Sequence, residues 1–437
     1  MSHVRRDALD IFKHALSASR VDFAMGQHVR FAGGALRVDE NEYSLERYER
    51  LVLIAMGKAA GTMTRAFLHA AGGFAGRFEG VVVAPGLVEL DKTRFRVWHG
   101  GHPLPNAASV EAAGDILRTL EVLTERDLVV FLVSGGGSAM VERFLEPGIS
   151  VETLAATHKA LVESGAPIAA MNAVRKHLSA VKGGRLAAAA APAEQLTIFV
   201  SDVPAGQLDA LSSGPTMPDG STVEDVYRIA EEYGLVERFP DVVAKMIAER
   251  SLVETPKAGD QIFARSRWSV LLDSVSLEEA AAARARELGW KVEVDNGCDD
   301  WDVLRAAEYL VQRVGELRRS GERVCLLSAG EVTVKVPQGV KGKGGRNQHF
   351  TLLCAELIAG RKVEILSAGS DGVDGHSSAA GGVVDGTTMA RANAAGYPVR
   401  AALACFDSND LLAMLGDAVV TGPTGNNLRD LRILLAP

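Results

Sequence analysis

Short, uninterrupted apolar runs, separated by segments with helical patterning, constrain the fold of this chain more than any other feature. Such runs occupy residues 51–55, 80–84, 127–133 and 196–200. A strand that is apolar along its whole length is buried on both faces, as in a parallel sheet that helices cover on both sides. We therefore predict an α/β fold with a mostly parallel sheet in the N-terminal part of the chain.

A second α/β pattern follows in the C-terminal part. Expected strands at 268–272, 291–294, 324–328, 332–336 and 363–367 alternate with expected helices at 276–288, 302–319 and 347–359. At roughly 100–200 residues per domain, a chain of 437 residues suits two or three domains. We predict two α/β domains, 1–240 and 241–437.

Charge and composition exclude several classes of protein. The chain has 47 basic and 55 acidic residues, a formal net charge of −8 and no basic block, so neither nucleic acid nor an anionic membrane is expected as a partner. Its apolar runs are far shorter than the roughly 20 residues that span a bilayer, and the N-terminus lacks the apolar core of a signal peptide. Four cysteines without a CxxC pair favour free thiols in the cytoplasm.

Polar residues follow the expected N-terminal strands, and in parallel sheets ligands bind at the carboxyl ends of the strands. The loop Ser134-Gly135-Gly136-Gly137-Ser138 suits the cradling of a phosphate or carboxylate by backbone N–H groups, although a tight turn would use the same glycines. Lys58 follows the run 51–55. Asp202 follows the run 196–200, where it suits a general base or a metal ligand.

Two cationic segments lie elsewhere in the chain. In the glycine-rich loop 341–348, Arg346 stands at the expected start of a helix, where a guanidinium can hold phosphate oxygens. Lys341 and Lys343 of that loop suit either phosphate binding or a flexible, solvated connection. Asn172, Arg175 and Lys176 share one face of an expected helix, which suits either a substrate site or a solvated basic face.

The carboxylates that suit magnesium are Asp202, Glu331, Asp371 and Asp374, because Mg²⁺ is usually held by one or two carboxylates together with substrate phosphates. For Asp371, turn formation through Asp-Gly is the alternative. The segment 371–375 does not continue to the final Glu of an EF-hand loop, which excludes that type of calcium site. The chain also lacks the P-loop, G-x-G-x-x-G, H-E-x-x-H and G-x-S-x-G motifs. What remains is an α/β enzyme that binds a phosphorylated or carboxylated small molecule in an interdomain cleft.

Short motifs follow one another in order from about residue 50 to the C-terminus. They are Met56-Gly57-Lys58-Ala59-Ala60, Gly101-His102-Pro103-Leu104-Pro105, the segments 132–139 and 172–185, Ser201-Asp202-Val203-Pro204, Ser213-Gly214-Pro215-Thr216, Gly344-Gly345-Arg346-Asn347-Gln348, the segment 371–375, and 421–427 with Asp430-Leu431. Each motif is weak alone. In this order they resemble the glycerate 2-kinase family, the type-2 glycerate kinases with a MOFRL C-terminal domain.

The resemblance implies phosphoryl transfer from ATP to the 2-hydroxyl of D-glycerate, giving 2-phosphoglycerate, with Mg²⁺. It implies a Rossmann-like three-layer N-terminal domain, a second α/β domain and an active site in the cleft between them. The family's functional lysine, arginine and aspartate fall on Lys58, Arg346 and Asp202: the two cations would neutralise the transferring phosphoryl group, and the aspartate would accept the hydroxyl proton or hold Mg²⁺. The implied phosphate- and substrate-binding residues are Ser134, Gly135, Gly136, Gly137, Ser138, His102, Asn172, Arg175, Lys176, Gly344, Gly345, Asn347, Gln348, Thr424 and Asn427.

The chain departs from the family pattern in three places. Ala205-Gly206-Gln207 replaces a glycine and acidic residues, Ala329-Gly330 replaces a double glycine, and His349 replaces a commoner glutamate. Two other functions stay open: an NAD(P)H-dependent hydroxypyruvate reductase, a name that members of this family carry, and a non-catalytic protein that binds a hydroxy acid. The missing dinucleotide fingerprint argues against the reductase. A homodimer is one candidate for the oligomeric state.

Overall fold

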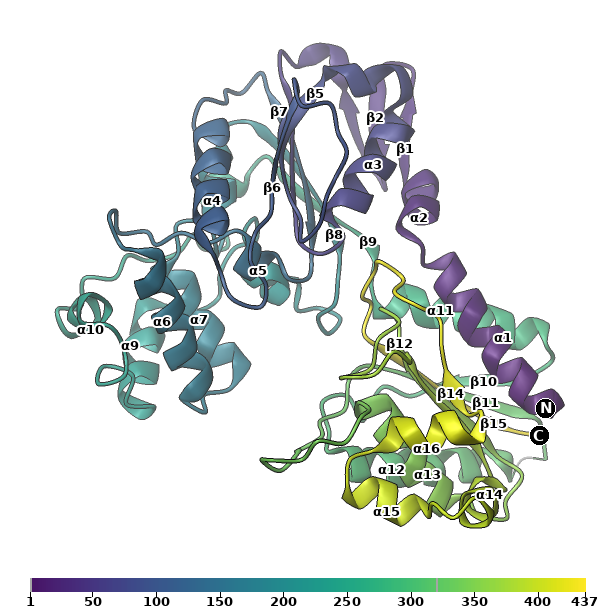
Figure 1. Cartoon of the computed structure of the whole chain (residues 1–437). Coiled ribbons are helices and arrows are strands. Elements are labelled where there is room, and N and C mark those ends of the chain that lie inside the picture. The colour runs from purple at the N-terminus through teal and green to yellow at the C-terminus, as the bar shows by residue number, and fades with distance from the viewer. Residues whose placement is uncertain (1, 320) are drawn as a thin grey trace. The chain divides into compact units, whose positions relative to one another are not determined.

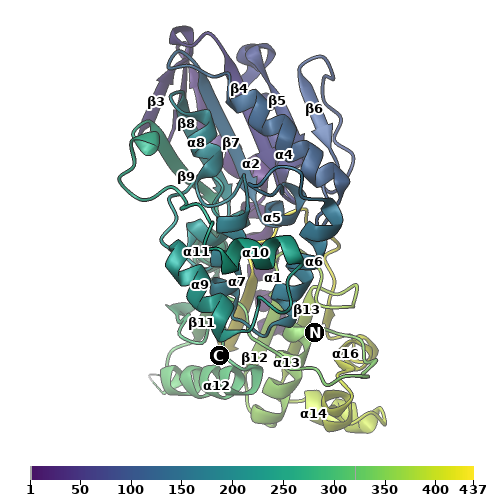
Figure 2. The same ribbon diagram turned by 90° about the vertical axis from the view of Figure 1, so that its left-hand side faces the viewer.

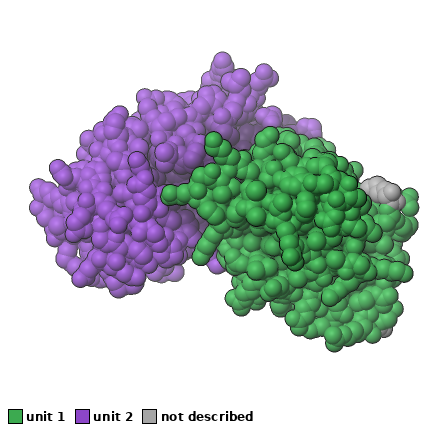
Figure 3. Space-filling model, turned by 60° about the horizontal axis from the view of Figure 1, so that its bottom comes forward, with its two compact units in different colours: residues 1–20, 272–437 green, residues 21–271 purple. Residues whose placement is uncertain are grey.

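The computed structural model describes residues 2–319 and 321–437. It divides into two compact units, coloured separately in Figure 3. One unit is Val21–Leu271, and the other combines the segment up to Arg20 with Leu272–Pro437. Within the described residues, each unit is built on a six-stranded sheet with helices packed against it. The predicted α/β class with two sheets is confirmed.

The sheet of the Val21–Leu271 unit has the strand order β6-β5-β4-β7-β8-β9, and the pairs from β6 to β8 are parallel. The predicted apolar runs form its centre. The strands are β4 (Leu51–Met56), β5 (Phe78–Val83), β6 (Phe95–Trp98), β7 (Leu128–Ser134), β8 (Glu194–Val200) and β9 (Ser266–Leu272). A separate antiparallel sheet consists of β1 (Val29–Ala32), β2 (Ala35–Val38) and β3 (Asn41–Ser44).

Helices cover both faces of this sheet. For this reason, β4 and β7 are buried along their whole length. Figure 1 shows α3 (Ala60–Ala71) and α4 (Ala107–Leu120) on opposite faces. Figure 2 shows α4 and α8 (Arg185–Ala190) lying across one of these faces, where Ile116 and Val52 share a buried apolar cluster. Further helices of the unit are α2 (Val21–His28), α5 (Gly137–Met140), α6 (Val151–Glu163), α7 (Ile168–Leu178), α9 (Val223–Glu232) and α10 (Asp241–Ala248), with the 3₁₀ turns η1 (Leu45–Arg47), η2 (Gly72–Arg77), η3 (Leu208–Ser213) and η4 (Gln261–Phe263).

The parallel register aligns the carboxyl ends of the central strands. Met56 pairs with both Val83 and Val133, and Ser134 pairs with Val200. The turns that follow β4, β7 and β8 therefore start at one edge of the sheet. This is the edge at which the sequence predicts a ligand site.

The second unit has the strand order β10-β11-β15-β12-β13-β14. β10 and β11 are parallel, whereas β15 runs antiparallel to β11 and β12, and β13 antiparallel to β12 and β14. The strands are β10 (Lys291–Val294), β11 (Val324–Ala329), β12 (Glu364–Gly369), β13 (Gly381–Asp385), β14 (Ala418–Val419) and β15 (Asp430–Ala436). The helices are α1 (His3–Ala18), α11 (Ser274–Glu287), α12 (Val303–Arg318), α13 (Arg346–Leu357), α14 (Thr388–Ala394), α15 (Val399–Ala404) and α16 (Ser408–Leu415).

Two features of this unit differ from the sequence prediction. The expected strand 332–336 is not part of the sheet and contributes one isolated bridge, from Thr333 to Asp302. β13 and β15 were not predicted, although β15 lies between β11 and β12 and is buried throughout. In no helix that the structure describes are length and apolar character sufficient to cross a bilayer.

The boundaries of the two compact units differ from those of the predicted domains 1–240 and 241–437. β9 adds to the first sheet beside β8 and so carries the Val21–Leu271 unit past residue 240. α1 packs on α11 and belongs to the second unit. Apolar spacing predicts such a helix but does not say which sheet its buried face will cover.

Arg5 ties α1 to the second unit. Its Nε lies 2.6 Å from Glu364 Oε1, and its Nη1 lies 2.5 Å from Asp417 Oδ1. Glu364 is 3% exposed and Asp417 is fully buried. Removing one partner from a buried ion pair leaves an uncompensated charge, which costs more than the pair itself contributes.

We expect Arg5→Ala to lower the free energy of unfolding of the second unit by about 3 kcal/mol. The loss comes mainly from Glu364, because Asp417 keeps its ion pair with Arg391. Denaturant unfolding followed by circular dichroism measures the change. Arg6→Ala, at the exposed neighbouring position, is the matched control and should change stability by about 0.5 kcal/mol or less. Equal stabilities of the two variants would show that these ion pairs do not hold α1.

Candidate active site

The turn after β4 passes directly over the end of β7. Gly57 has a φ of +113°, and a Cβ atom there would lie 2.3 Å from the carbonyl oxygen of Ser134. The Lys58 N–H donates to the Gly135 carbonyl (2.9 Å), and the Ala59 N–H donates to Ser134 Oγ (3.0 Å). A side chain at position 57 would prevent this approach, so glycine is required to place Lys58 beside the triglycine loop.

Three of the predicted site residues surround the triglycine loop. A Cβ atom on Gly135 would lie 1.8 Å from Asp202 Oδ2, and one on Gly136 would lie 3.1 Å from Lys58 Cγ and 3.2 Å from His102 Cδ2. Gly136 also has a φ of +83°. Lys58, His102 and Asp202 come from three separate segments and converge here because the loop carries no side chains of its own.

The electrostatics of this cluster combine a cation, a carboxylate and a neutral ring. Burial, together with the positive charge of Lys58, lowers the pKa of His102, so its imidazole is neutral at neutral pH. Lys58 is exposed, and its amine is accessible to an anionic ligand. Such a set suits the binding of a phosphate or carboxylate and the transfer of a proton.

Two serines that were not predicted as site residues also hold the triglycine loop. Ser212 Oγ donates to the Ser134 carbonyl (2.8 Å), and the hydroxyls of Ser213 and Ser138 lie 3.0 Å apart. Ser212 and Ser213 have φ values of +49° and +61°, which cost about 1–2 kcal/mol per non-glycine residue. Strain of this kind is found preferentially at functional sites. The motif Ser213-Gly214-Pro215-Thr216 was the one signal in the sequence.

The predicted cationic face of α7 is largely engaged within the chain. Lys176 is buried, and its Nζ lies 3.2 Å from Asp209 and 3.1 Å from Asp219. Arg175 is partly buried, and among the described residues its buried Nε has no hydrogen-bond partner. Burial lowers the pKa of Arg175, which the charge of Glu142 opposes. Lys176 thus has a structural function, whereas Arg175, on the same helix as the half-buried Asn172, retains an unfilled donor.

In the second unit, Arg346 is the first residue of α13 and is held by two carboxylates. Its Nε lies 2.6 Å from Asp430 Oδ2, and its Nη1 and Nη2 lie 2.7 Å and 2.6 Å from the Glu331 oxygens. Although burial opposes it, Asp430 and Glu331 raise the pKa of Arg346. Burial and the charge of Asp430 raise the pKa of Glu331. The predicted arginine is therefore fixed in position, and the predicted metal ligand Glu331 is its partner.

Asp374 caps the same helix. Its carboxylate accepts hydrogen bonds from the N–H groups of Asn347 (3.1 Å) and Gln348 (2.9 Å) and from both of their side-chain amides (3.3 and 3.1 Å). A Cβ atom on Gly345 would lie 2.3 Å from Asp374 Oδ1, and one on Gly344 would lie 3.1 Å from Ser408 Oγ. These glycines and amides, predicted to bind substrate, thus serve to seat the helix N-terminus.

The loops around Arg346 enclose a cavity of about 730 Å³. Its lining includes the predicted residues Gly344, Gly345, Arg346, Asn347, Asp371, Asp374 and Asn427, with Asp430. Asp371 Oδ1 accepts a hydrogen bond from the Val373 N–H (3.0 Å). This contact closes the Asp-Gly turn that was the alternative role of Asp371. Thr424 Oγ1 donates to the Ser370 carbonyl (2.6 Å), so this threonine fixes the neighbouring loop.

Comparison with known proteins gives one consistent result. The family described as "Domain of unknown function (DUF4147)" matches residues 7–248, and the MOFRL family matches residues 324–430. A D-glycerate 2-kinase of Thermotoga maritima is 36% identical over 88% of this chain and 90% of its own length. A glycerate 2-kinase of Pyrococcus horikoshii is 34% identical over 99% of this chain and 97% of its own. The chain belongs to the glycerate 2-kinase family.

Solved structures agree with this assignment. The crystal structure of a glycerate kinase from Thermotoga maritima superposes with a TM-score of 0.85 at 33% identity and covers 99% of both chains. Members of the glycerate 2-kinase family do not all carry a kinase name. A protein of Agrobacterium vitis named putative hydroxypyruvate reductase is 35% identical over 88% of this chain and 87% of its own.

In this member of the glycerate 2-kinase family, Asp430 and a network behind it were also not predicted as parts of the site. Buried Arg429, with a φ of +70°, donates from Nη2 to Asp299 Oδ1 (2.9 Å). The same oxygen accepts the Glu331 N–H (2.9 Å). This chain of contacts fixes the glutamate that fixes Arg346. Asp430-Leu431 was among the family motifs, but its partner lies 84 residues away in the sequence, which no local pattern reveals.

The family implies Mg²⁺, and the predicted carboxylates fit this ion unequally. Across residues 2–319 and 321–437, no group of three or more His, Cys, Asp or Glu side chains is arranged to hold a metal. Glu331 is engaged by Arg346, and Asp374 by N–H donors. Asp202 lies against Gly135, and a carboxylate next to a loop that suits phosphate fits an Mg²⁺ that substrate phosphates also hold.

We expect Gly136→Ala to lower kcat by about 10²-fold, because a methyl group at this φ displaces Lys58 and His102. Steady-state kinetics with ATP and D-glycerate measures the change. Gly165→Ala is the matched control: its φ of +79° is similar, but nothing lies within 4 Å of the added Cβ. If Gly136→Ala turned over as fast as Gly165→Ala, the loop would not position Lys58 and His102 for the reaction.

Burial raises the pKa of Asp374 to about 6, so the folded state holds its proton more tightly than the unfolded chain. Because the proton bound in the folded state is lost over this range, the second unit becomes less stable as pH rises from about 4 to about 6, by about 2 kcal/mol for this one group. We expect Asp374→Asn to remove that dependence. Denaturant unfolding of both proteins between these pH values tests it, and parallel stability curves would contradict it.

Proposed function

We propose that the protein transfers the γ-phosphoryl group of ATP to the 2-hydroxyl of D-glycerate and releases 2-phosphoglycerate and ADP. The observation that carries the proposal is the convergence of Lys58, Asp202 and His102 over the triglycine loop. Relatives named glycerate 2-kinase with 34–36% identity over most of the chain support it. Cys298, Cys325, Cys354 and Cys405 are free thiols, which suits an assignment to the reducing cytoplasm.

Phosphoryl transfer requires positioning and neutralisation of negative charge more than covalent chemistry. We assign the exposed Lys58 amine to the phosphate oxygens of the nucleotide. The triglycine loop lets a phosphate or carboxylate approach the backbone N–H groups, since no Cβ stands in the way. Arg346 is assigned a second contact with phosphate, and its fixed guanidinium loses little conformational entropy when it binds.

The acceptor side of the reaction is assigned to Asp202 and His102. As the glycerate 2-hydroxyl oxygen bonds to the γ-phosphorus, the bond from that phosphorus to the β–γ bridging oxygen breaks and ADP leaves. Asp202 accepts the hydroxyl proton, or the same carboxylate holds Mg²⁺, which supplies further neutralisation of the phosphate charge when bound. Neutral His102 is suited to donate a hydrogen bond to the glycerate carboxylate or hydroxyl.

We expect Lys58→Ala and Arg346→Lys each to lower kcat by about 10²-fold or more, as for a lost donor to the developing charge. Lysine at position 346 keeps the charge but not the bidentate geometry, and it avoids leaving Asp430 without a cation. Lys92→Ala and Lys343→Ala, at exposed positions of the same two units, are the matched controls. Turnover at the level of these controls would refute both assignments.

Hydroxypyruvate reduction is the competing function, because two relatives from Agrobacterium vitis are named putative hydroxypyruvate reductase. A coupled assay separates the two, with ADP release in the presence of glycerate on one side and NADH oxidation in the presence of hydroxypyruvate on the other. The proposed kinase releases ADP and leaves NADH unchanged. NADH oxidation without ATP-dependent phosphorylation of glycerate would establish the reductase instead.

A further inference from the structure

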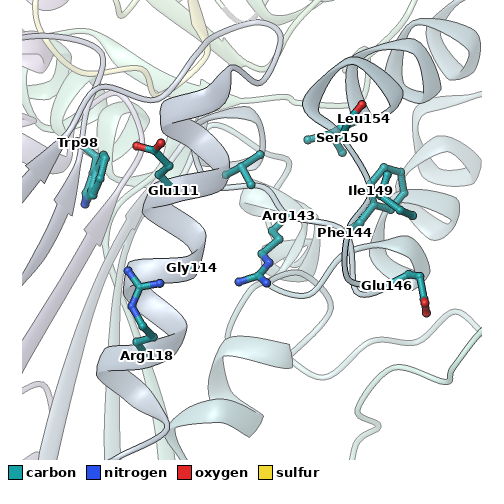
Figure 4. A pocket seen from close by; sticks show the side chains of 12 residues that line it. Trp98, Glu111, Gly114, Arg118, Arg143, Phe144, Glu146, Ile149, Ser150 and Leu154 are labelled. Atoms are coloured by element: carbon teal, nitrogen blue, oxygen red, sulfur yellow. The ribbon is translucent and has the colours of Figure 1, made fainter.

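The Val21–Leu271 unit contains a second pocket, formed by residues other than those assigned above to phosphate or glycerate. It has a volume of about 460 Å³. Figure 4 shows its wall, which consists of Trp98 from β6, one face of α4, the segment 143–150 and the first turn of α6. A pocket of this size accommodates a small organic molecule.

Two guanidinium groups lie close together in the wall of this pocket. A Cβ atom on Gly114 would lie 3.3 Å from Nη1 of Arg118 and 3.3 Å from Nη1 of Arg143. The two nitrogens are therefore at most 6.6 Å apart, twice 3.3 Å. A single phosphate or carboxylate group can accept a hydrogen bond of about 2.8 Å from each. Figure 4 shows both guanidiniums at the same end of the pocket.

The positive charge of this pair is incompletely balanced. Arg118 Nη2 lies 3.6 Å from Asp115 Oδ1, but Asp115 is also bound by Arg96 Nε (2.9 Å) and Trp98 Nε1 (2.9 Å). For Arg143, the described chain offers no carboxylate within ion-pair distance of the guanidinium. The two positive charges repel each other at this separation, and both attract an anion that lies between them.

Two carboxylates also line the pocket, but neither lies beside the arginine pair. Glu111 precedes Gly114 by three residues, but Figure 4 shows its carboxylate directed away from both guanidiniums. Figure 4 shows the Glu146 side chain directed away from both guanidiniums. The N-cap Ser150 is also in the wall, so α6, of 13 residues, begins at the pocket with the positive end of its dipole.

The rest of the lining is apolar. Phe144 and Leu154 are buried, and Val110 and Ile149 are half-buried. In Figure 4, Phe144 and Ile149 lie together on the side of the pocket across from α4. A ligand that suits both parts has an anionic head and an apolar body, because a fully hydrated ion would leave this wall exposed to water.

We propose that this pocket binds a small organic anion, a carboxylate or phosphate monoester with an apolar substituent. The anionic group lies between Arg118 and Arg143, and the apolar substituent lies against Phe144 and Ile149. The site is separate from the one assigned to ATP and glycerate.

Titration with phenyl phosphate and with benzoate, followed by tryptophan fluorescence, tests the proposal, because Trp98 lines the pocket. We expect saturable binding of at least one probe and no binding of neutral benzyl alcohol. The double variant Arg118→Met, Arg143→Met should weaken the affinity about tenfold or more. Trp98→Phe should remove the fluorescence change.

Two further variants complete the design. Arg126→Met is the matched control, because Arg126 and Arg118 are similarly exposed, at 67% and 69%, and it should bind the probes as the wild type does. Lys58→Ala should also retain binding, which separates this site from the proposed active site. Absence of binding to the wild type, unchanged affinity in the double arginine variant, or loss of binding in Lys58→Ala would overturn the proposal. A crystal of the wild type with phenyl phosphate gives a second test that needs no variant: phosphorus found away from the arginine pair would also overturn it.

Discussion

Contact between the turn after β4 and the end of β7 determines the geometry of the N-terminal site. The Gly57 backbone lies against the Ser134 carbonyl, and the Lys58 N–H bonds to Gly135. This contact depends on the parallel register, since shifting β4 by one residue would turn its side chains to the opposite face. Lys58, His102 and Asp202 then meet around the triglycine loop, because its glycines leave the space that these side chains occupy.

The C-terminal unit positions its cation by a different physical means. Arg346 is held by Glu331 and Asp430, and Glu331 is held in turn by Asp299. Buried ion pairs contribute little net stability, because desolvation offsets their attraction. We interpret this network as one that fixes orientation. The cap formed by Asp374 adds to this, since it anchors the first turn of α13.

The sequence predicts the N-terminal site better than the C-terminal one, for a physical reason. In a parallel sheet, the ends of apolar runs meet at one edge, so the proximity of Lys58 and Asp202 follows from local pattern alone. The antiparallel β15, which begins at Asp430, pairs with β11 and β12 across long sequence separations. Hydrophobic periodicity is a local pattern and does not predict such pairings. The sequence predicts that Asn172, Arg175 and Lys176 share one helix face, but the carboxylates that engage the buried Lys176 come from segments without a recognisable pattern.

The membership of α1 in the second unit has a consequence for biosynthesis. This helix is translated before the Val21–Leu271 unit, yet its buried face, with Ile11 and Phe12, packs on elements of the segment that begins at Leu272. Domains translated early usually fold first. Here the Val21–Leu271 unit can fold during translation, while the apolar side of α1 stays uncovered until α11 (Ser274–Glu287) and the strands after it have been synthesised. A chaperone that shields amphipathic nascent segments would find such a segment in α1 during this interval.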